Sequence, residues 1–446
     1  MTSESNSFPL GEMSEGQSGK KVLIITYYWP PAGGPGVQRW LKFVKYLPDY
    51  GIHPVVYIPK NPSYPMLDDT LMTEITKDVT ILKHPIKEPY RFAEVLSKKA
   101  SKTMSSGVIP KEQKQSLIQQ LMLYVRGNYF IPDARKAWVK PSVSYLSEYL
   151  QKENIETVIT TGPPHSLHLI GLKLKVQLGT KWIADFRDPW TTIGYHKKLK
   201  LSARATKKHE ELEVKVLSTA DHIIVTSDNT KKEFATKSKQ SISVITNGYD
   251  YQQLPKGTKD QKFSLAHIGS LLSGRNPKVL WKVLGELIQE NDDFRQEFVL
   301  RLIGLVSDVV LNEIRKFIPD NNIENVGYVN HTEALMYQRQ SQLLLLIEID
   351  SEDTKAIIPG KLFEYMVAET PIIAVGPEDT DVERIIASTN TGRYFYYNAE
   401  AELKEHFQSC FSNFKNATLV SYPIGLQQYS RKALTKKLAD LITNLS

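Results

Sequence analysis

Short apolar runs alternate with amphipathic segments along most of this chain of 446 residues, and the whole pattern occurs twice. The first series begins at Lys20 with KKVLIITYY and ends with ISVITNGYD, and the second begins at Phe263 with FSLAHIGS and ends with PIIAVGP. Apolar runs separated by helical patterns are typical of parallel strands joined by crossover helices. We therefore expect an α/β fold in which two Rossmann-like, doubly wound parallel-sheet domains face a cleft.

Turn-forming and charged residues separate the two series, in GYDYQQLPKGTKDQ. A basic, aromatic and helical segment interrupts the first series, and the last helical pattern, YSRKALTKKLADLITNL, spaces its leucines for packing on the first domain. The predicted parts are a disordered tail (1–19), an N-terminal domain (20–248) with a helical insertion (about 89–141), a linker (249–262), a C-terminal domain (263–420) and a C-terminal helix (421–446).

The composition excludes several kinds of protein. The single cysteine, Cys410, rules out a disulfide framework and a cysteine-based metal site. His165 and His168 are three residues apart without an acidic neighbour, so we predict no metal site. No run reaches the ~18–20 apolar residues that span a bilayer, and LLLLIEI, the longest, is expected to be a buried strand. The N-terminus lacks a secretory pattern, and we expect a cytoplasmic protein, in contact at most with the inner face of the membrane.

The charge and the insertion bear on possible partners. The formal net charge of +7 suits phosphorylated ligands or acidic lipid surfaces, and a solvated surface with a lysine excess explains it equally well. Because this charge is spread along the chain, we expect no nucleic acid partner. In the insertion, Leu117, Leu121 and Tyr124 form a stripe that favours a core-facing helix, although such a basic segment is also suited to gripping a lipid-like acceptor.

A glycine-rich turn, AGGPGVQR, follows the first predicted strand. A dinucleotide fingerprint needs a third glycine where Arg39 stands and an acidic residue after the second strand, which instead ends in YIPKNP. The turn also lacks the G-K-[ST] of a P-loop. What remains is either a plain strand-to-helix turn or one whose Gly33 and Gly34 bring a helix N-terminus close to an anion. We expect Arg39 to face solvent or an acidic neighbour.

Three charged residues of the second series can hold a nucleotide. In IIPGKLFEYM, Gly360 opens a helix, Lys361 adds a charge suited to a diphosphate, and Glu364 can accept hydrogen bonds from a ribose diol. In HIGSLLSGRNP, Arg275 follows a strand and has the planar fork that binds two phosphate oxygens. An ordinary helix start with an i,i+3 ion pair and a solvated loop arginine are the alternatives.

Two strand ends of the first series complete the candidates. In TTGPPHS, His165 follows two prolines at a helix start, and we expect it to be exposed and functional. In DFRDPW, Asp185 and Arg187 either bind substrate or form an ion-paired strand end.

The order of these motifs resembles that of the retaining, nucleotide-sugar-dependent glycosyltransferases of the GT-B fold, in particular family 4. The resemblance covers the chain from Lys20 and rests on GGPG, NGYD, HIGSLLSGRNP, VGYVNHTEAL and above all PGKLFEYMVAETPIIA, while DFRDPW with PPHS is similar to a bacterial subset acting in surface polysaccharide assembly. It implies these roles: Gly33 and Gly34 near the donor diphosphate and acceptor, His165 on the transferred sugar, Arg275 and Lys361 on the diphosphate, Glu364 on the ribose, and the backbone near Tyr328 on the base.

The resemblance implies sugar transfer with retention and without a metal or cofactor, from a nucleotide-sugar donor to a glycan or polyprenyl-linked acceptor. Two positions depart from the family pattern: Ala356 stands where a sugar-positioning glutamate is usual, and Ser270 stands where an arginine is usual. A nucleotide-sugar 2-epimerase of the same fold and an inactive, nucleotide-sugar-binding scaffold are the competing hypotheses.

Overall fold

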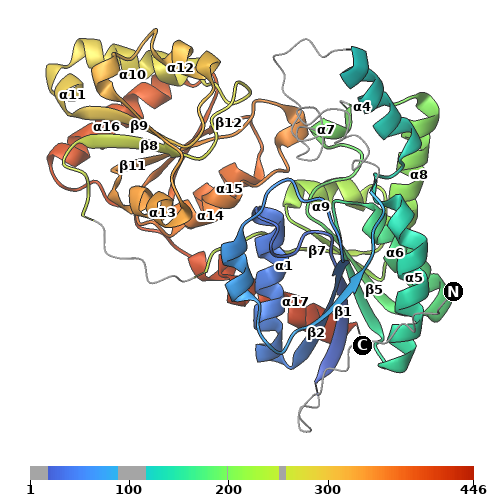
Figure 1. The fold of residues 1–446 in the computed structure, drawn as a ribbon. Coiled ribbons are helices and arrows are strands. Elements are labelled where there is room, and N and C mark those ends of the chain that lie inside the picture. The colour runs from blue at the N-terminus through green and yellow to red at the C-terminus, as the bar shows by residue number, and fades with distance from the viewer. Residues whose placement is uncertain (1–18, 89–116, 198, 251–257, 446) are drawn as a thin grey trace.

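The structure is a computed structural model that describes residues 19–88, 117–197, 199–250 and 258–445. Two α/β domains meet along one side, and the C-terminal segment returns to the first of them (Figure 1). Most of the predicted tail and linker and the first part of the predicted insertion lie outside the described residues.

The N-terminal domain contains a seven-stranded sheet in the order β3-β2-β1-β4-β5-β6-β7, with every neighbouring pair parallel. Its central strands are buried on both faces, which explains their continuous apolar runs. The strands are β1 (Lys20–Ile25), β2 (Ile52–Pro59), β3 (Thr80–His84), β4 (Thr157–Gly162), β5 (Lys181–Phe186), β6 (His222–Val225) and β7 (Ser241–Val244).

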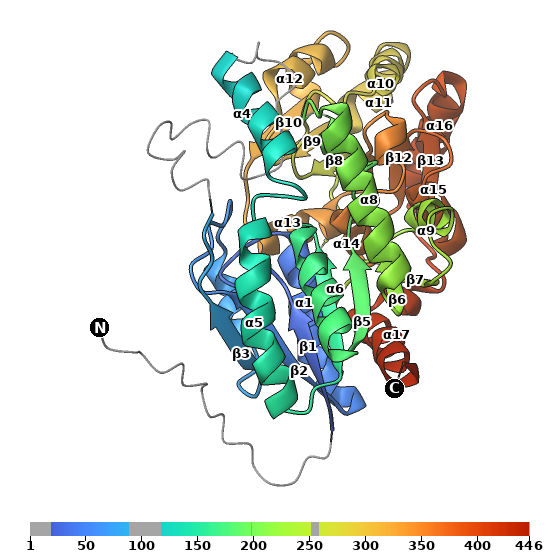
Figure 2. The same cartoon turned by 90° about the vertical axis from the view of Figure 1, so that its right-hand side faces the viewer.

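Helices cover both faces of this sheet. Figure 2 shows α5 (Lys136–Lys152), α6 (Ser166–Leu178) and α8 (Ala203–Thr219) side by side on one face. They share a core with α9 (Asp228–Ala235), while α1 (Pro35–Tyr46) covers the other face. The short α7 (Gly194–Lys197) precedes α8.

The C-terminal domain repeats the design with six parallel strands in the order β10-β9-β8-β11-β12-β13. The strands are β8 (Phe263–Ile268), β9 (Phe298–Ile303), β10 (Ile323–Gly327), β11 (Leu343–Ile347), β12 (Ile372–Gly376) and β13 (Gly392–Tyr396). One face carries α10 (Lys278–Glu290), α11 (Asp292–Glu297), α12 (Asp308–Ile314) and α16 (Glu400–Lys415). The other carries α13 (His331–Gln340), α14 (Gly360–Met366) and α15 (Asp381–Thr389).

The predicted pair of doubly wound parallel sheets is therefore confirmed, including LLLLIEI as a buried strand in β11. The edge strands β3 and β13 were not predicted from the sequence. Each of the two strands has a single buried residue, and the others are half-buried or exposed, because one side of an edge strand has no neighbouring strand. Neither strand therefore shows a continuous apolar run.

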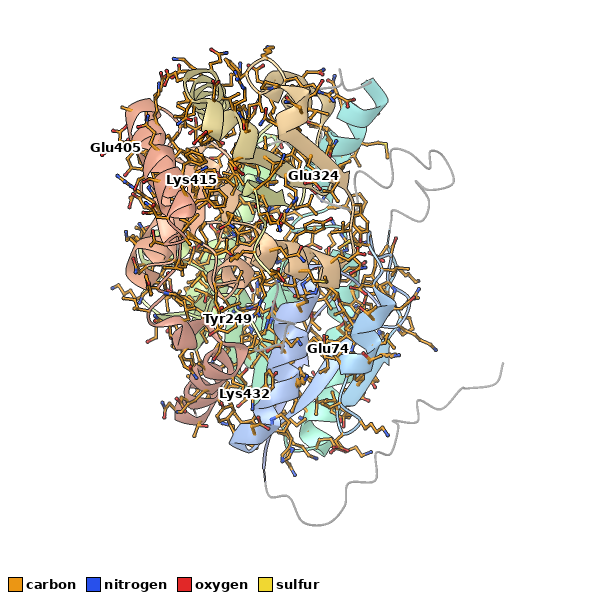
Figure 3. The ribbon with its side chains drawn as sticks, turned by 90° about the vertical axis from the view of Figure 1, so that its left-hand side faces the viewer. Glu74, Tyr249, Glu324, Glu405, Lys415 and Lys432 are labelled. Carbon is orange, nitrogen blue, oxygen red and sulfur yellow. The ribbon has the colours of Figure 1, made fainter. Side chains whose placement is uncertain are left out.

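The chain crosses between the domains twice. After β13 and α16 it returns, and α17 (Arg431–Asn444) packs beside α1, burying Leu434, Leu438 and Ile442 in the N-terminal core. The two crossing segments are joined where the Tyr249 N–H donates to the Tyr429 carbonyl at 3.1 Å and the Arg431 N–H to the Tyr249 carbonyl at 2.8 Å. Tyr249 lies at the level where the domains meet (Figure 3).

Helix α4 (Leu117–Tyr129) corrects one prediction. Leu121 and Tyr124 were expected to face the core, but they are 62% and 41% exposed. The helix instead contacts α8, and its Gly127 lies against Leu199 and Leu201 in the segment that precedes α8. Within the described residues, no helix is both long enough and apolar enough to span a membrane.

Candidate active site

A cavity of about 550 Å³ lies between the two domains. Lys42 of α1 and Glu74 of the neighbouring 3-10 turn form part of its N-terminal wall, and His331 and Glu364 form part of its C-terminal wall. Glu364 accepts hydrogen bonds from His331 Nε2 at 3.1 Å and from Gln338 Nε2 at 3.2 Å. Glu364, the residue predicted to bind the ribose, therefore faces the space between the domains, and two neighbouring side chains hold its carboxylate in place.

His331 is a residue that the sequence did not single out. Its hydrogen bond to Glu364 and the charges of Glu364, Asp68 and Glu74 raise the pKa of His331 above its ordinary value. Because Asp68 and Glu74 belong to the N-terminal domain, His331 senses charge from both walls of the cavity. The signal was present in VGYVNHTEAL, but only the fold brings this histidine to Glu364.

Lys361, the second residue of α14, and Arg275, in the loop after β8, form a pair of cations in the C-terminal domain. Lys361 Nζ donates to the carbonyl of Ile268, the last residue of β8, at 2.7 Å. It lies over Gly269, where a Cβ would be only 3.0 Å from Nζ and where φ is 109°. Burial first, and then the Arg275 charge, lower the pKa of Lys361 to about 7.

These two cations are balanced only at a distance, since burial lowers the pKa of both and the charges of Glu364 at Lys361 and of Glu348 at Arg275 offset that lowering in part. Within the described residues, neither Lys361 nor Arg275 forms an ion pair, and burial lowers the pKa of Arg275, offset in part by Tyr397 and Glu348. Glu348, which follows β11, is 4% exposed and accepts from Tyr394 Oη at 2.7 Å. Burial raises the pKa of Glu348 to about 7. Two half-buried like charges that form no ion pair within the described residues suit an anionic ligand.

Two further predicted residues, Gly360 and Tyr328, also belong to the C-terminal domain. Gly360 is the first residue of α14, which is only seven residues long. Tyr328 follows β10 and is 91% exposed, so its side chain has no packing role in this conformation.

The glycine turn after β1 is bound to a second segment. The Gly33 N–H donates to the Met66 carbonyl at 3.0 Å, and the Asp68 N–H donates to the Pro31 carbonyl at 2.8 Å. Gly34 precedes α1 with a φ of 100°, a value that favours glycine. A shift of this turn on domain closure would have to break these bonds or carry residues 66–68 with it.

The prediction that His165 is exposed is wrong. Its side chain is 5% exposed because Trp190 covers it, with ring centroids 4.8 Å apart and planes 2° from parallel. Both ring nitrogens lack a hydrogen-bond partner in the described structure. Burial and the neighbouring His168 hold the pKa of His165 well below its ordinary value, so the imidazole is neutral.

Asp185 and Arg187 are placed very differently. Asp185 is fully buried, and its carboxylate accepts from Arg39 Nη2 at 2.9 Å, Trp40 Nε1 at 2.9 Å and Thr161 Oγ1 at 2.8 Å. Of the two predicted alternatives, Asp185 in this structure matches the ion-paired strand end and not a substrate-binding residue. The acidic neighbour predicted for Arg39 is Asp185 itself. Arg187 donates to the Pro163 carbonyl and lies against Gly36, where a Cβ would be 1.8 Å from Nη1.

Ala356 lies in the loop before α14, on a second interdomain cavity of about 570 Å³. Glu352 and Asp353 line the same cavity, together with His196 from the N-terminal domain. Within the part of the chain that the structure describes, no three histidine, cysteine or acidic side chains are grouped to hold a metal ion.

Comparison with known proteins supports the resemblance. Residues 106–253 match the model of Glycosyltransferase Family 4, whereas no curated protein sequence matches the chain. Among solved structures, Anabaena HepE in complex with UDP has a TM-score of 0.59 and 10% identity, covering 95% of this chain and 100% of HepE. WaaG, a glycosyltransferase involved in lipopolysaccharide biosynthesis, has a TM-score of 0.53 and 15% identity, covering 95% and 99%.

A putative UDP-N-acetylglucosamine 2-epimerase from Listeria monocytogenes also shares the fold, with a TM-score of 0.50, 12% identity and 96% coverage of both chains. These likenesses establish the GT-B fold and do not separate transfer from epimerisation. The family 4 match covers residues 106–253, less than half of the chain, and the chain as a whole has the GT-B fold of these structures.

Proposed function

We propose that this enzyme transfers a sugar from a nucleoside-diphosphate donor to a glycan or polyprenyl-linked acceptor in the synthesis of cell-surface polysaccharide. The observation that carries the proposal is the cation pair of Arg275 and Lys361, which forms no ion pair within the described residues. Lys361 lies one helical turn from a carboxylate, Glu364, that faces the interdomain cavity. A diphosphate joined to a ribose presents the matching groups, two anionic phosphates and a diol.

The chemistry follows from where charge develops. Breaking the bond between sugar and diphosphate leaves negative charge on the leaving phosphate and an oxocarbenium-like sugar. The Arg275 fork and the Lys361 ammonium stabilise that leaving charge, while Glu364 exchanges its hydrogen bond from His331 for the ribose hydroxyls. The neutral imidazole of His165 has an unused donor and an unused acceptor for sugar hydroxyls.

We propose retention of anomeric configuration, with the leaving phosphate taking the acceptor proton, and no requirement for a divalent metal or cofactor. Since HepE is described in complex with UDP, uridine diphosphate sugars are the first donors to test. On the acceptor side, the exposed apolar residues Leu121 and Tyr129 of α4, which are 62% and 66% exposed, support peripheral contact with a lipid-linked acceptor at the inner face of the membrane.

The test measures transfer and donor binding together. UDP-, GDP- and dTDP-sugars are screened by thermal shift, since a bound donor raises the melting temperature by mass action. Transfer from the best donor to lipid-linked acceptor extracts is then measured for Arg275→Ala and Lys361→Ala, each of which should fall at least about tenfold. Arg315→Ala, which removes an exposed ion pair of the same domain, is the matched control.

Three outcomes separate the hypotheses. Transfer at the wild-type rate in both site variants, with the fold intact, refutes the site. Conversion of the donor sugar without any acceptor identifies a 2-epimerase. Donor binding without turnover on any acceptor identifies the scaffold, the alternative that Ala356 keeps open.

A further inference from the structure

Contacts between buried rings lead from His165 through Trp190 to His209 of helix α8 and on to His196. Trp190 is 1% exposed and stacks face to face on His165. On its other side, Trp190 Nε1 donates a hydrogen bond to His209 Nδ1 at 3.1 Å. His209 is 1% exposed and meets His196 edge to face at 4.5 Å. His165 therefore has no freedom to rotate out of its plane while Trp190 stays in place.

The hydrogen bond also fixes the protonation of His209. An indole N–H can only donate, so Nδ1 of His209 must carry a lone pair, and burial lowers the pKa of His209 in agreement. A neutral His209 thus holds Trp190, and Trp190 holds the plane of His165. By contrast, neither ring nitrogen of His165 forms a hydrogen bond within the part of the chain that the structure describes.

We propose that Trp190, held by His209, is the positioning residue that presents the His165 imidazole to the sugar in transit. This inference rests on the proposed function. It assigns a role to the tryptophan of DFRDPW. The first aspartate of the same motif, Asp185, instead accepts hydrogen bonds from Arg39 and Trp40 inside the domain. Both ring nitrogens of His165 are shielded from solvent in this structure, so a sugar hydroxyl group reaches them only when neighbouring residues move as the sugar binds, and it then meets a ring that Trp190 has already oriented.

Trp190 has a second effect on His165, through exclusion of water. The titratable and charged groups that face His165 are His168 from α6, Arg187 after β5, His196 from α7 and His209 from α8. Each of these groups lowers the pKa of His165, in the same direction as burial. Opening the indole face to water should move this pKa upward, toward its ordinary range.

The experiment compares six proteins: wild type, Trp190→Phe, Trp190→Ala, His209→Leu, His209→Asn and the control Trp138→Phe. Trp138 is an equally buried indole that stacks on Tyr57 away from His165. His209→Leu removes the acceptor, and His209→Asn restores an oxygen acceptor near the Nδ1 position. We expect kcat to fall about tenfold or more in Trp190→Phe and His209→Leu, and to recover to within about threefold in His209→Asn. The Kd for UDP should stay unchanged in all of them, because Arg275 and Lys361 are untouched.

Two pH measurements separate positioning from general destabilisation. In wild type, the NMR signals of His165 should not titrate between about pH 5 and 8, whereas in Trp190→Ala they should titrate in this range. The acid limb of kcat should move upward in the same variant. Variants that fold, keep wild-type kcat and leave His165 non-titrating overturn the proposal. A wild type that transfers no sugar, but in which the titration shifts as expected, overturns the proposed function and not the role of Trp190.

Discussion

Asp381 of the second domain accepts a hydrogen bond from the backbone N–H of Asn229 in the first domain, at 3.2 Å. Its other oxygen accepts from the neighbouring N–H of Asp228 at 2.9 Å, so a carboxylate from one domain caps helix α9 of the other. Arg384 completes the contact by donating to Asn229 Oδ1 at 2.8 Å. Asp381 is 3% exposed, which makes this contact a buried hinge point between the domains.

Removing this carboxylate should loosen the domain arrangement. Asp381→Ala leaves two backbone N–H groups of α9 without a partner, and loss of a helix cap costs about 1 kcal/mol. We expect a lower melting temperature and a larger radius of gyration by small-angle X-ray scattering. Asp440→Ala removes an exposed carboxylate of α17 and should change neither value. Unchanged scattering in Asp381→Ala would contradict a hinge role.

Donor binding should weaken as the pH rises through about 7. Burial and Arg275 lower the pKa of Lys361 to about 7, so the free enzyme loses the Lys361 charge above this pH. Binding a diphosphate then requires proton uptake, and the Kd for UDP should rise by up to about tenfold for each pH unit. Calorimetric titrations across this range measure the effect. Lys361→Arg keeps its charge and should flatten the dependence; a flat wild-type curve counts against the assignment.

Removing divalent metal should leave transfer intact. Arg275 and Lys361 already supply positive charge for the leaving diphosphate, so the rate in excess EDTA should lie within about twofold of the rate with magnesium. The measurement is initial-rate transfer with metal-stripped enzyme and donor. Loss of activity in EDTA that magnesium or manganese restores would refute the metal-independent proposal.

A methyl group at Gly36 should act through Arg187. A Cβ there would lie 1.8 Å from Arg187 Nη1, so Gly36→Ala displaces the guanidinium from the Pro163 carbonyl. If Arg187 contacts the substrate, transfer should fall about tenfold with little loss of stability, because the displaced group is a flexible side-chain end. Arg187→Ala and the double variant complete a mutant cycle. Additive losses would show that the two residues act independently.

The sequence allowed the two sheets and the cleft between the domains to be predicted, because continuous apolar runs are local patterns. It also singled out Arg275 and Lys361 as diphosphate-binding residues, and that role stays a prediction. Contacts between distant segments were not readable in this way. His165 was expected to be exposed because it follows two prolines, and only the fold brings Trp190 over it. Asp185 is a candidate substrate-binding residue in the sequence, yet in the fold its carboxylate accepts a hydrogen bond from Arg39, 146 positions earlier in the chain. Edge strands β3 and β13 were missed because half of their surface faces solvent.

The return of α17 to the first domain has a consequence for biosynthesis. Leu434, Leu438 and Ile442 belong to the same apolar core as Trp40 and Val44, yet nearly 400 residues separate the two groups. Domains generally fold in the order in which they leave the ribosome. Here the first domain to emerge keeps one face of its sheet incompletely covered while the whole second domain is translated. A chaperone that shields Trp40 during this interval would be acting on the nascent chain. A premature stop codon before α17 would leave the N-terminal domain without part of its own core.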